Sequence, residues 1–191
     1  MNMRKGIELE YKMLLKYNQF KRIQQKYPFS YPIKQVNHYY DTSDQILNKK
    51  RYALRIRDIG DKRILTLKVP QKQGVMEYEC EVDSYDFTLL SLPQELLEAL
   101  SFLDVKGLKK FASLTTYRSV YETEDAIICL DENHYAKRCD YEIEYEVKRE
   151  HDSLSTFLSL LRENAIYEFK PAPGKARRMK NAIRFDKTPK K

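Results

Sequence analysis

The sequence predicts an α+β fold in which an antiparallel β-sheet closes into a barrel with a few helices packed outside. Three features of the 191 residues support this fold. Predicted strands outnumber predicted helices, neighbouring strands are joined mostly by short turns, and five strands carry a face built almost wholly from ionisable side chains. A chain of this length can bury one core without splitting, so we expect a single domain over residues 1–191.

Alternation of polar and apolar residues identifies the strands, and a switch to helical spacing identifies the helices. Pro28 ends the first helix, while Pro93 and Asp152 suit the start of two later ones. A short loop at 59–61 predicts a hairpin. The expected strands are 6–12, 35–41, 51–58, 62–69, 75–82, 113–122, 126–131 and 139–148, and the expected helices are 14–27, 93–103, 152–164 and about 174–184.

Composition limits the class of protein. Hydrophobic residues make up 42% and charged residues 33%, which is typical of a globular chain, and the formal net charge of +7 favours an anionic partner. Three cysteines, an odd number without CxxC spacing, favour buried free thiols in a reducing compartment. No apolar run approaches the ~20 residues of a membrane span, so we expect a soluble, cytoplasmic protein without a membrane partner.

The polar faces of five predicted strands prefer carboxylate, guanidinium and ammonium groups. Their residues are Glu8, Glu10 and Lys12; Arg55 and Arg57; Thr66 and Lys68; Glu77, Glu79 and Glu81; and Asp140, Glu142, Glu144, Glu146 and Lys148. For any one strand, a solvated surface with exposed ion pairs is the simpler interpretation. Across five strands that interpretation weakens, because like charges at alternate positions repel unless cations lie between them. We therefore expect these faces to line a wet barrel interior that holds a ligand.

The residue types on these faces indicate the ligand. The planar fork of arginine matches phosphate oxygens, and lysine adds a point charge. Clustered carboxylates offer all-oxygen sites for Mg²⁺ or Mn²⁺. The opposite faces are apolar, and we expect the helices to cover them. Tyr39, Tyr141 and Tyr145 are expected on these outer faces.

The order of motifs resembles the CYTH, or triphosphate tunnel metalloenzyme, superfamily. The opening Glu8-x-Glu10-x-Lys12 is similar to the ExExK signature of that family. The other matching segments are HYYDT (38–42), LRIR (54–57), LTLKVP (65–70), EYECEV (77–82), YRSVYE (117–122), LDEN (130–133), DYEIEYE (140–146) and PGKARR (173–178). The overall character is closest to uncharacterised members from Gram-positive bacteria.

The resemblance implies a closed eight-stranded tunnel that binds a triphosphate with divalent metal. Carried over residue by residue, the phosphate-binding cations are Lys12, Arg55, Arg57, Lys68, Arg118, Lys175 and Arg178. The metal ligands are Glu8, Glu10, Glu79, Asp131, Glu142 and Glu144, and the catalytic group comprises Glu8, Glu10, Lys12 and Glu144. The register of the acidic strands 77–81 and 142–146 could shift by two residues. Related proteins often dimerise, which leaves a homodimer open.

The expected reaction is metal-dependent hydrolysis of inorganic tripolyphosphate or of a nucleoside or thiamine triphosphate, in which a metal-activated water attacks phosphorus. No Ser, Cys or His nucleophile is expected: His38 is assigned a structural role, and His134 and His151 are placed on the surface. A class IV-type adenylate cyclase is an alternative, although no adenine pocket is identifiable. A non-catalytic polyphosphate or nucleotide binder is another. Nucleic acid fits poorly, because carboxylates alternate with the basic residues.

Overall fold

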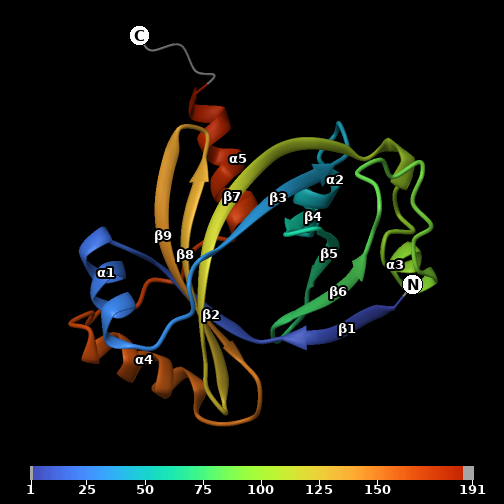
Figure 1. Cartoon of the computed structure of the whole chain (residues 1–191). Coiled ribbons are helices and arrows are strands. Elements are labelled where there is room, and N and C mark those ends of the chain that lie inside the picture. Colours follow the sequence, from blue (N-terminus) through green and yellow to red (C-terminus); the bar gives the residue numbers. More distant parts are fainter. Residues whose placement is uncertain (1, 187–191) are drawn as a thin grey trace. The chain divides into compact units, whose positions relative to one another are not determined.

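The structure is a computed structural model that describes residues 2–186, with side chains to residue 183. The predicted domain also included residues 1 and 187–191, which lie outside the described residues. The described part of the chain forms nine strands and five α-helices, which are labelled in Figure 1. The elements are β1 (Met3–Glu8), β2 (Glu10–Leu15), α1 (Tyr17–Lys26), β3 (Ile33–Asp41), α2 (Ile46–Lys49), β4 (Ala53–Ile59), β5 (Lys62–Pro70), β6 (Val75–Glu81), α3 (Gln94–Ala99), a 3₁₀ turn (Val105–Gly107), β7 (Lys109–Glu122), β8 (Ala126–Tyr135), β9 (Arg138–Val147), α4 (Ser153–Glu163) and α5 (Lys175–Asp186).

The sheet has the strand order β1-β6-β5-β4-β3-β7-β8-β9-β2. This confirms an α+β chain built on an antiparallel sheet. The count of eight strands is wrong, because the predicted strand 6–12 forms two strands that are separated at Leu9. The two parts have different neighbours, since β1 pairs with β6 and β2 pairs with β9. Closure into a barrel stays a prediction.

The chain divides into two compact units, which we describe separately. Unit 1 comprises the segment that ends at Glu8 and the segment Gln35–Leu114; unit 2 comprises Leu9–Lys34 and the described part of the chain from Thr115 onward. The expectation of a single domain stays a prediction.

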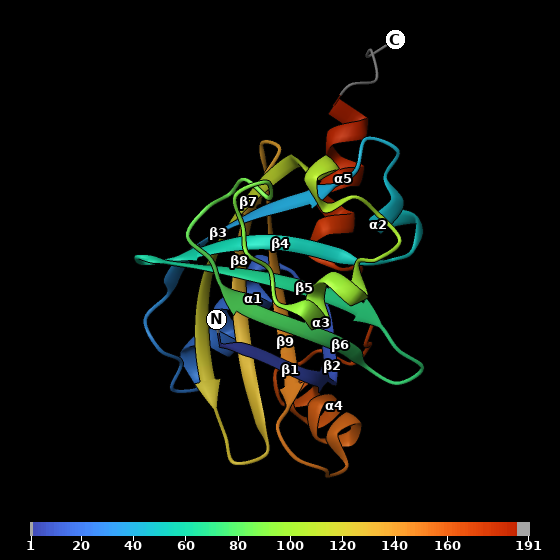
Figure 2. The ribbon, with the colours of Figure 1, turned by 90° about the vertical axis from the view of Figure 1, so that its right-hand side faces the viewer.

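In unit 1, one face of β4, β5 and β6 is apolar and is buried against helical and loop residues. Leu54, Ile56 and Leu67 on this face are at most 1% exposed. They belong to one core cluster with Leu96 and Leu100 from α3 and its end. Figure 2 views unit 1 with α3 beside β5 and β6. The strand alternation therefore places every second residue of β4–β6 on the opposite face.

The short helix α2 was not predicted, and the structure explains how it forms. Asp41 is buried at the end of β3. Its carboxylate accepts hydrogen bonds from the backbone N–H groups of Thr42, Leu47 and Asn48, at 2.9, 2.9 and 3.2 Å. This local side-chain bonding holds the turn into α2 and assigns the aspartate of HYYDT a structural role.

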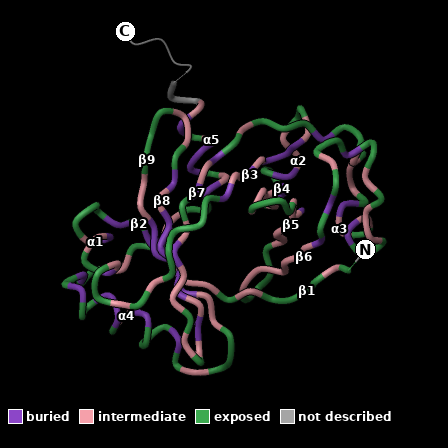
Figure 3. The backbone as a smooth tube through the Cα atoms, in the orientation of Figure 1, coloured by how far each residue is buried: buried purple, intermediate pink, exposed green. Residues whose placement is uncertain are grey.

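In unit 2, the apolar face of β2, β8 and β9 is covered by α1 and α4. Figure 3 shows buried residues along β8 and β9, and the core cluster includes Ile128, Ile143, Phe20, Ile23 and Phe157. Asp152 caps α4, as expected, by accepting a hydrogen bond from the N–H of Ser155. The prediction that helices cover the apolar strand faces is thus confirmed in each unit.

Two corrections concern single side chains. Tyr141 and Tyr145 lie on the helix-covered face as expected, but Tyr39 does not. Tyr39 is directly opposite Arg55 in the β3–β4 register, and opposite residues in an antiparallel pair share a face. Its neighbour Tyr40 takes the core position instead.

All three cysteines are free thiols; Cys80 and Cys129 are buried, but Cys139 is exposed.

Among the described residues, none of the helices combines the length and apolar character that crossing a membrane requires.

We expect Phe157→Ala to lower the free energy of unfolding by about 3–5 kcal/mol. Its ring is fully buried and packs against Tyr11, Tyr145 and Phe169 at centroid distances of 6.0, 5.6 and 5.4 Å. Urea unfolding measures the loss. Leu154→Ala on the same helix is the control, because Leu154 is 42% exposed and its loss should cost no more than about 0.5 kcal/mol. Equal losses in the two variants would contradict the assigned core.

Candidate functional site

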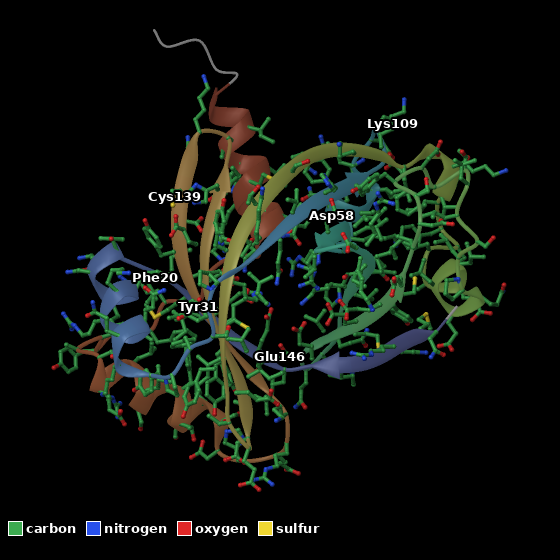
Figure 4. The ribbon with its side chains drawn as sticks, viewed as in Figure 1. Phe20, Tyr31, Asp58, Lys109, Cys139 and Glu146 are labelled. Atoms are coloured by element: carbon green, nitrogen blue, oxygen red, sulfur yellow. The ribbon has the colours of Figure 1, made fainter. Side chains whose placement is uncertain are left out.

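Each unit carries charged side chains on the sheet face that its helices do not cover. We call them the unit 1 cluster and the unit 2 cluster. The unit 1 cluster consists of Glu8, Arg55, Arg57, Lys68, Glu77 and Glu79. The unit 2 cluster consists of Glu10, Lys12, Arg118, Asp131, Asp140, Glu142, Glu144, Lys175 and Arg178. The side chains of the strands are drawn in Figure 4.

Strand register brings the unit 1 cluster together. Arg55 lies opposite Thr66, which lies opposite Glu79, so these three residues form one row across β4, β5 and β6. Thr66 donates to Glu79 at 2.9 Å, and Arg57 from the next row donates to the same carboxylate oxygen at 3.1 Å. A second donor of Arg57 reaches Gln35 at 3.3 Å. Glu79 is therefore held by a hydroxyl and a guanidinium.

The second part of the unit 1 cluster surrounds Lys68. Its ammonium contacts Glu8 and lies 3.5 Å from Glu77, which is also 3.9 Å from Arg55. Burial raises the pKa of Glu77, while Lys68 acts to lower it. Gly74 in the β5–β6 turn has φ +71°, and a Cβ there would lie 2.5 Å from the carbonyl oxygen of Glu8. Glycine is thus required for the close approach that positions Glu8.

One buried acceptor in unit 1 lacks a protein donor. Asn37 lies directly opposite Arg57 and is 2% exposed. Its Oδ1 has no hydrogen-bond partner among the described residues. A buried amide oxygen without a donor is costly, so a bound cation, water or ligand at this face would stabilise it.

Register also assembles the unit 2 cluster. Arg118, Asp131 and Glu142 form one row across β7, β8 and β9. Arg118 binds Asp131 through two N–H groups, at 2.8 and 2.7 Å, and also donates to Glu144. Such paired hydrogen bonds fix the plane of the guanidinium as well as its charge.

Lys175, the first residue of α5, lies among three carboxylates. Its Nζ is 2.8 Å from Asp131, 2.5 Å from Glu142 and 2.7 Å from Glu144. Asp131 and Glu142 are fully buried, and the side chain of Lys175 is only 8% exposed. The ammonium therefore neutralises acids that could not otherwise stay ionised together.

Arg178 lies one turn further along α5 and extends the same network. It binds Glu142 through two hydrogen bonds of 2.9 Å and reaches Asp140 at 3.1 and 3.3 Å. It also donates to the carbonyl oxygen of Pro173 at 2.6 Å. Asp140 in turn accepts from Asn133 at 3.0 Å. The start of α5 is thus tied to β9 by charge-assisted bonds.

The pKa values in the unit 2 cluster follow from these contacts. Burial by itself would raise the pKa of Asp131 and Glu144, but Arg118 and Lys175 hold the pKa of Asp131 below its usual range and that of Glu144 well below it. Burial by itself would lower the pKa of Lys175, yet the carboxylates raise it well above its usual value. Both partners therefore stay charged at neutral pH.

The unit 2 cluster includes a candidate metal centre. Oxygen atoms of Asp131, Glu142 and Glu144 lie within 4.8 Å of one another. An all-carboxylate donor set of this size suits a hard divalent cation such as Mg²⁺ or Mn²⁺. These residues fit the metal expected from the sequence, although Lys175 contacts the same three carboxylates.

The predicted site residues divide between the units. Arg55, Arg57, Lys68, Glu8 and Glu79 lie in unit 1, whereas Lys12, Glu10, Arg118, Asp131, Glu142, Glu144, Lys175 and Arg178 lie in unit 2. Of the predicted metal ligands, Asp131, Glu142 and Glu144 come together. Glu8 contacts Lys68, Glu10 contacts Lys12, and Glu79 contacts Arg57. Their catalytic and binding roles stay predictions.

The structure shows which acids of strand 77–81 join the unit 1 cluster and adds residues that were not assigned to the site; which of them bind metal stays a prediction. Glu81 pairs with exposed Lys62 instead of with the unit 1 cluster, whereas Glu77 belongs to it. Asp140 is added because it binds Arg178. The alternation of β9 had placed Asp140 on the charged face, so its sequence signal was already visible.

His38 has no part in either cluster. Its ring nitrogens lie 2.8 Å from Ser113 Oγ and 3.1 Å from Asp58, and its ring packs against Tyr85. His38 lies opposite the core residue Ile56, which places it on the face away from Arg57.

Comparisons with known proteins identify the family to which this sequence is similar. A model of the CYTH domain matches residues 6–178. YjbK of Bacillus subtilis (strain 168), named as a candidate triphosphatase, is 34% identical over 171 residues, which are 86% of this chain and 90% of that protein.

Two solved structures are also similar. A protein of Bacillus halodurans, described as a candidate adenylate cyclase, is 30% identical with a TM-score of 0.81 and covers 91% of this chain and 97% of its own. HpAC1 from Hippeastrum, described as a candidate adenylyl cyclase with a dominant triphosphatase activity, is 25% identical with a TM-score of 0.76 and covers 92% and 96%.

We expect Lys175→Met, in the absence of divalent metal, to lower the free energy of unfolding by about 3–5 kcal/mol, because it leaves buried carboxylates without their cation. Urea unfolding with EDTA measures this loss. Lys170→Met is the matched control, since Lys170 pairs with Glu168 at an exposed position. A loss no larger than that of the control would contradict the role assigned to Lys175.

Acid should destabilise the protein through Asp131 and Glu144. Their folded pKa values lie below the unfolded ones, so their contribution is present above about pH 4 and is lost as pH falls toward the folded values. Unfolding free energies measured between pH 2 and 6 should fall below about pH 4 with a slope of up to about 1.4 kcal/mol per pH unit for each such group. Glu144→Gln should reduce the slope, whereas the exposed control Glu168→Gln should not. An unchanged slope in Glu144→Gln would refute this account.

Proposed function

Since the chain belongs to the CYTH domain family, we propose that it hydrolyses a triphosphate-bearing small molecule with the help of a divalent metal. The observation that carries this proposal is the convergence of Asp131, Glu142 and Glu144 beside Arg118 and Lys175. This grouping supplies metal-binding oxygens next to phosphate-binding cations. Phosphoryl transfer requires mainly such positioning and charge neutralisation. The names of YjbK and HpAC1 favour the same reaction class.

The cations of each unit are assigned to phosphate oxygens. In unit 1 these are Arg55, Arg57 and Lys68; in unit 2 they are Lys12, Arg118, Lys175 and Arg178. Arg118 and Arg57 are each held by a carboxylate, so their guanidinium groups are oriented before a ligand arrives. Groups that are already oriented lose less conformational entropy when the ligand binds, so the entropic cost of binding is smaller. Charge that develops on the phosphate would be stabilised by these preorganised donors.

Asp131, Glu142 and Glu144 would hold Mg²⁺ or Mn²⁺, with Glu8, Glu10 and Glu79 as the further predicted ligands. When bound, the metal would neutralise phosphate charge and lower the pKa of a coordinated water. Lys175 contacts the same three carboxylates, so its ammonium would have to leave them for a metal to bind. The released ammonium would then be available to a phosphate oxygen. In this proposal Lys175 stabilises the metal-free protein and would bind substrate when metal is present.

A cyclase that converts ATP to cyclic AMP and pyrophosphate is the second candidate. The Bacillus halodurans relative is described as a candidate enzyme of this type. The same cations and carboxylates would serve that reaction, and the products separate the two: hydrolysis of a terminal phosphate releases orthophosphate, whereas cyclisation releases pyrophosphate. A binder without turnover would release neither.

Three further expectations remain part of this proposal. The sheet closes into a tunnel with a charged interior. The binding partner is a small molecule rather than nucleic acid, and the chain could pair with a second copy of itself.

The test is release of orthophosphate and pyrophosphate from inorganic tripolyphosphate, ATP and thiamine triphosphate, each with Mg²⁺, Mn²⁺ or EDTA. We expect metal-dependent release of orthophosphate. Arg57→Ala and Arg118→Ala should each lower kcat by about 10²–10³, the loss typical of a preorganised donor to developing charge.

Two controls separate these effects from general damage. Arg63→Ala removes a guanidinium of unit 1 that contacts Asp58 and the carbonyl oxygen of Asp83, and Arg149→Ala removes one of unit 2 that pairs with Glu124 and Asp125. Both should retain activity, and circular dichroism should confirm that all four variants fold. Full activity in Arg57→Ala and Arg118→Ala would overturn the assignment. Metal-linked binding of tripolyphosphate without turnover would support the binder instead.

A further inference from the structure

The β8–β9 hairpin of unit 2 carries a second group of metal-binding side chains, outside the unit 2 cluster. Glu132, His134 and Cys139 each offer one ligand atom, and these atoms lie within 4.8 Å of one another. His134 Nε2 is 2.7 Å from Glu132 Oε1 and 4.0 Å from Cys139 Sγ. We propose that these three residues bind a borderline-soft divalent metal ion such as Zn²⁺.

Backbone geometry brings the three ligands together. A two-residue loop, Ala136 and Lys137, joins β8 to β9, and both residues have positive φ, at 45° and 58°. This conformation is that of a type I′ turn, which matches the twist of a hairpin and fixes its register. His134 and Cys139 are consequently direct cross-strand partners. Glu132 lies two residues before His134 and therefore on the same face of β8.

The chemistry of this group differs from that of the carboxylate centre. Thiolate and imidazole ligands select Zn²⁺ and similar ions, whereas carboxylates alone suit Mg²⁺ and Mn²⁺. Three protein ligands leave one position of a tetrahedral zinc ion for water or another small ligand. The spacing of cysteine and histidine in the sequence did not indicate a site, because only the hairpin makes residues five apart face each other.

Neighbouring contacts orient the ligands. The ring of Tyr117 lies edge-on to that of His134, with centroids 5.7 Å apart and planes at 87°. Glu132 also lines a cavity of about 300 Å³ together with Tyr17, Phe20 and Tyr117. The cavity provides room for a further ligand beside the carboxylate.

The location of this site suggests what it does. Along β8, Glu132 follows Asp131, and along β9, Cys139 precedes Asp140, so alternate residues of the same strands belong to the unit 2 cluster. A metal that bridges His134 and Cys139 would tie the two strands together near their turn. It would stabilise the hairpin that presents the carboxylates without itself binding phosphate.

Cobalt is the probe, because a cobalt–thiolate bond gives a near-ultraviolet charge-transfer band that oxygen ligands alone do not give. EDTA-treated full-chain protein is titrated with Co²⁺ and then with Zn²⁺. We expect one equivalent of Co²⁺ to produce the band and Zn²⁺ to remove it. Cys139→Ser should abolish the band, and His134→Ala should weaken binding by about 100-fold or more, because even outer-shell partners contribute about 10- to 100-fold.

Matched controls are available in the same chain. Cys80→Ser removes a buried thiol of unit 1, and Glu144→Gln alters the carboxylate centre; both should retain the band. As a second readout, Zn²⁺ should raise the thermal midpoint of the wild type more than that of Cys139→Ser, since a ligand that binds only the folded state stabilises it. Absence of the band in the wild type, or its persistence in Cys139→Ser, would overturn the proposal. The contact between Glu132 and His134 would then be an ordinary hydrogen bond without a metal-binding role.

Discussion

The ammonium of Lys175 lies among three carboxylates that are almost fully shielded from solvent, and neither side could be buried without the other. Removing an ion from water costs several kcal/mol, which is recovered only through close pairing and further hydrogen bonds. Arg118 and Arg178 supply those bonds to Asp131 and Glu142. The position of the start of α5 against β9 therefore depends on this charge balance.

This charge balance also makes the proposed site sensitive to the binding of a divalent cation. In the proposed function, a divalent cation would compete with the Lys175 ammonium for the same oxygens, so the carboxylates would be neutralised whichever cation is bound. The pKa directions agree with this view, because Lys175 and Arg118 hold the pKa of Glu144 well below its usual range against the opposing effect of burial. Lys175 and Arg118 thus keep Asp131 and Glu144 ionised without a bound metal, which an apolar residue at either position could not do.

Strand alternation determines which residues of the fold could be predicted. In β9, Glu142 and Glu144 alternate with Ile143 and Tyr145, and the structure separates them onto the charged and helix-covered faces as expected. The motif order also identified the family correctly, and the helices over the apolar faces followed from the same pattern. Tyr39 was misplaced because its strand, β3, has hydrophobic or aromatic residues at adjacent positions, so that alternation alone does not decide the face.

Other features depended on contacts that a sequence does not display. The break at Leu9 reflects a change of pairing partner from β6 to β9. The alternation of polar and apolar residues continues across Leu9, so the sequence gives no signal of this change. Helix α2 is held by hydrogen bonds to the buried Asp41 carboxylate. Such local bonds leave no periodic pattern in the sequence. The convergence of Asp131 with Glu142 and Glu144 required the β8–β9 register. Alternation had marked Glu142 and Glu144 as part of a carboxylate face, but Asp131 was named as a ligand only by family resemblance.

A crystal structure of the full chain with Mn²⁺ and tripolyphosphate, with the anomalous scattering of manganese recorded, tests the central claim most directly. The account predicts a manganese peak bound by Asp131, Glu142 and Glu144, with the Lys175 ammonium moved from these carboxylates onto a phosphate oxygen. Lys175 still bound to all three carboxylates, with manganese and tripolyphosphate bound elsewhere, would contradict it.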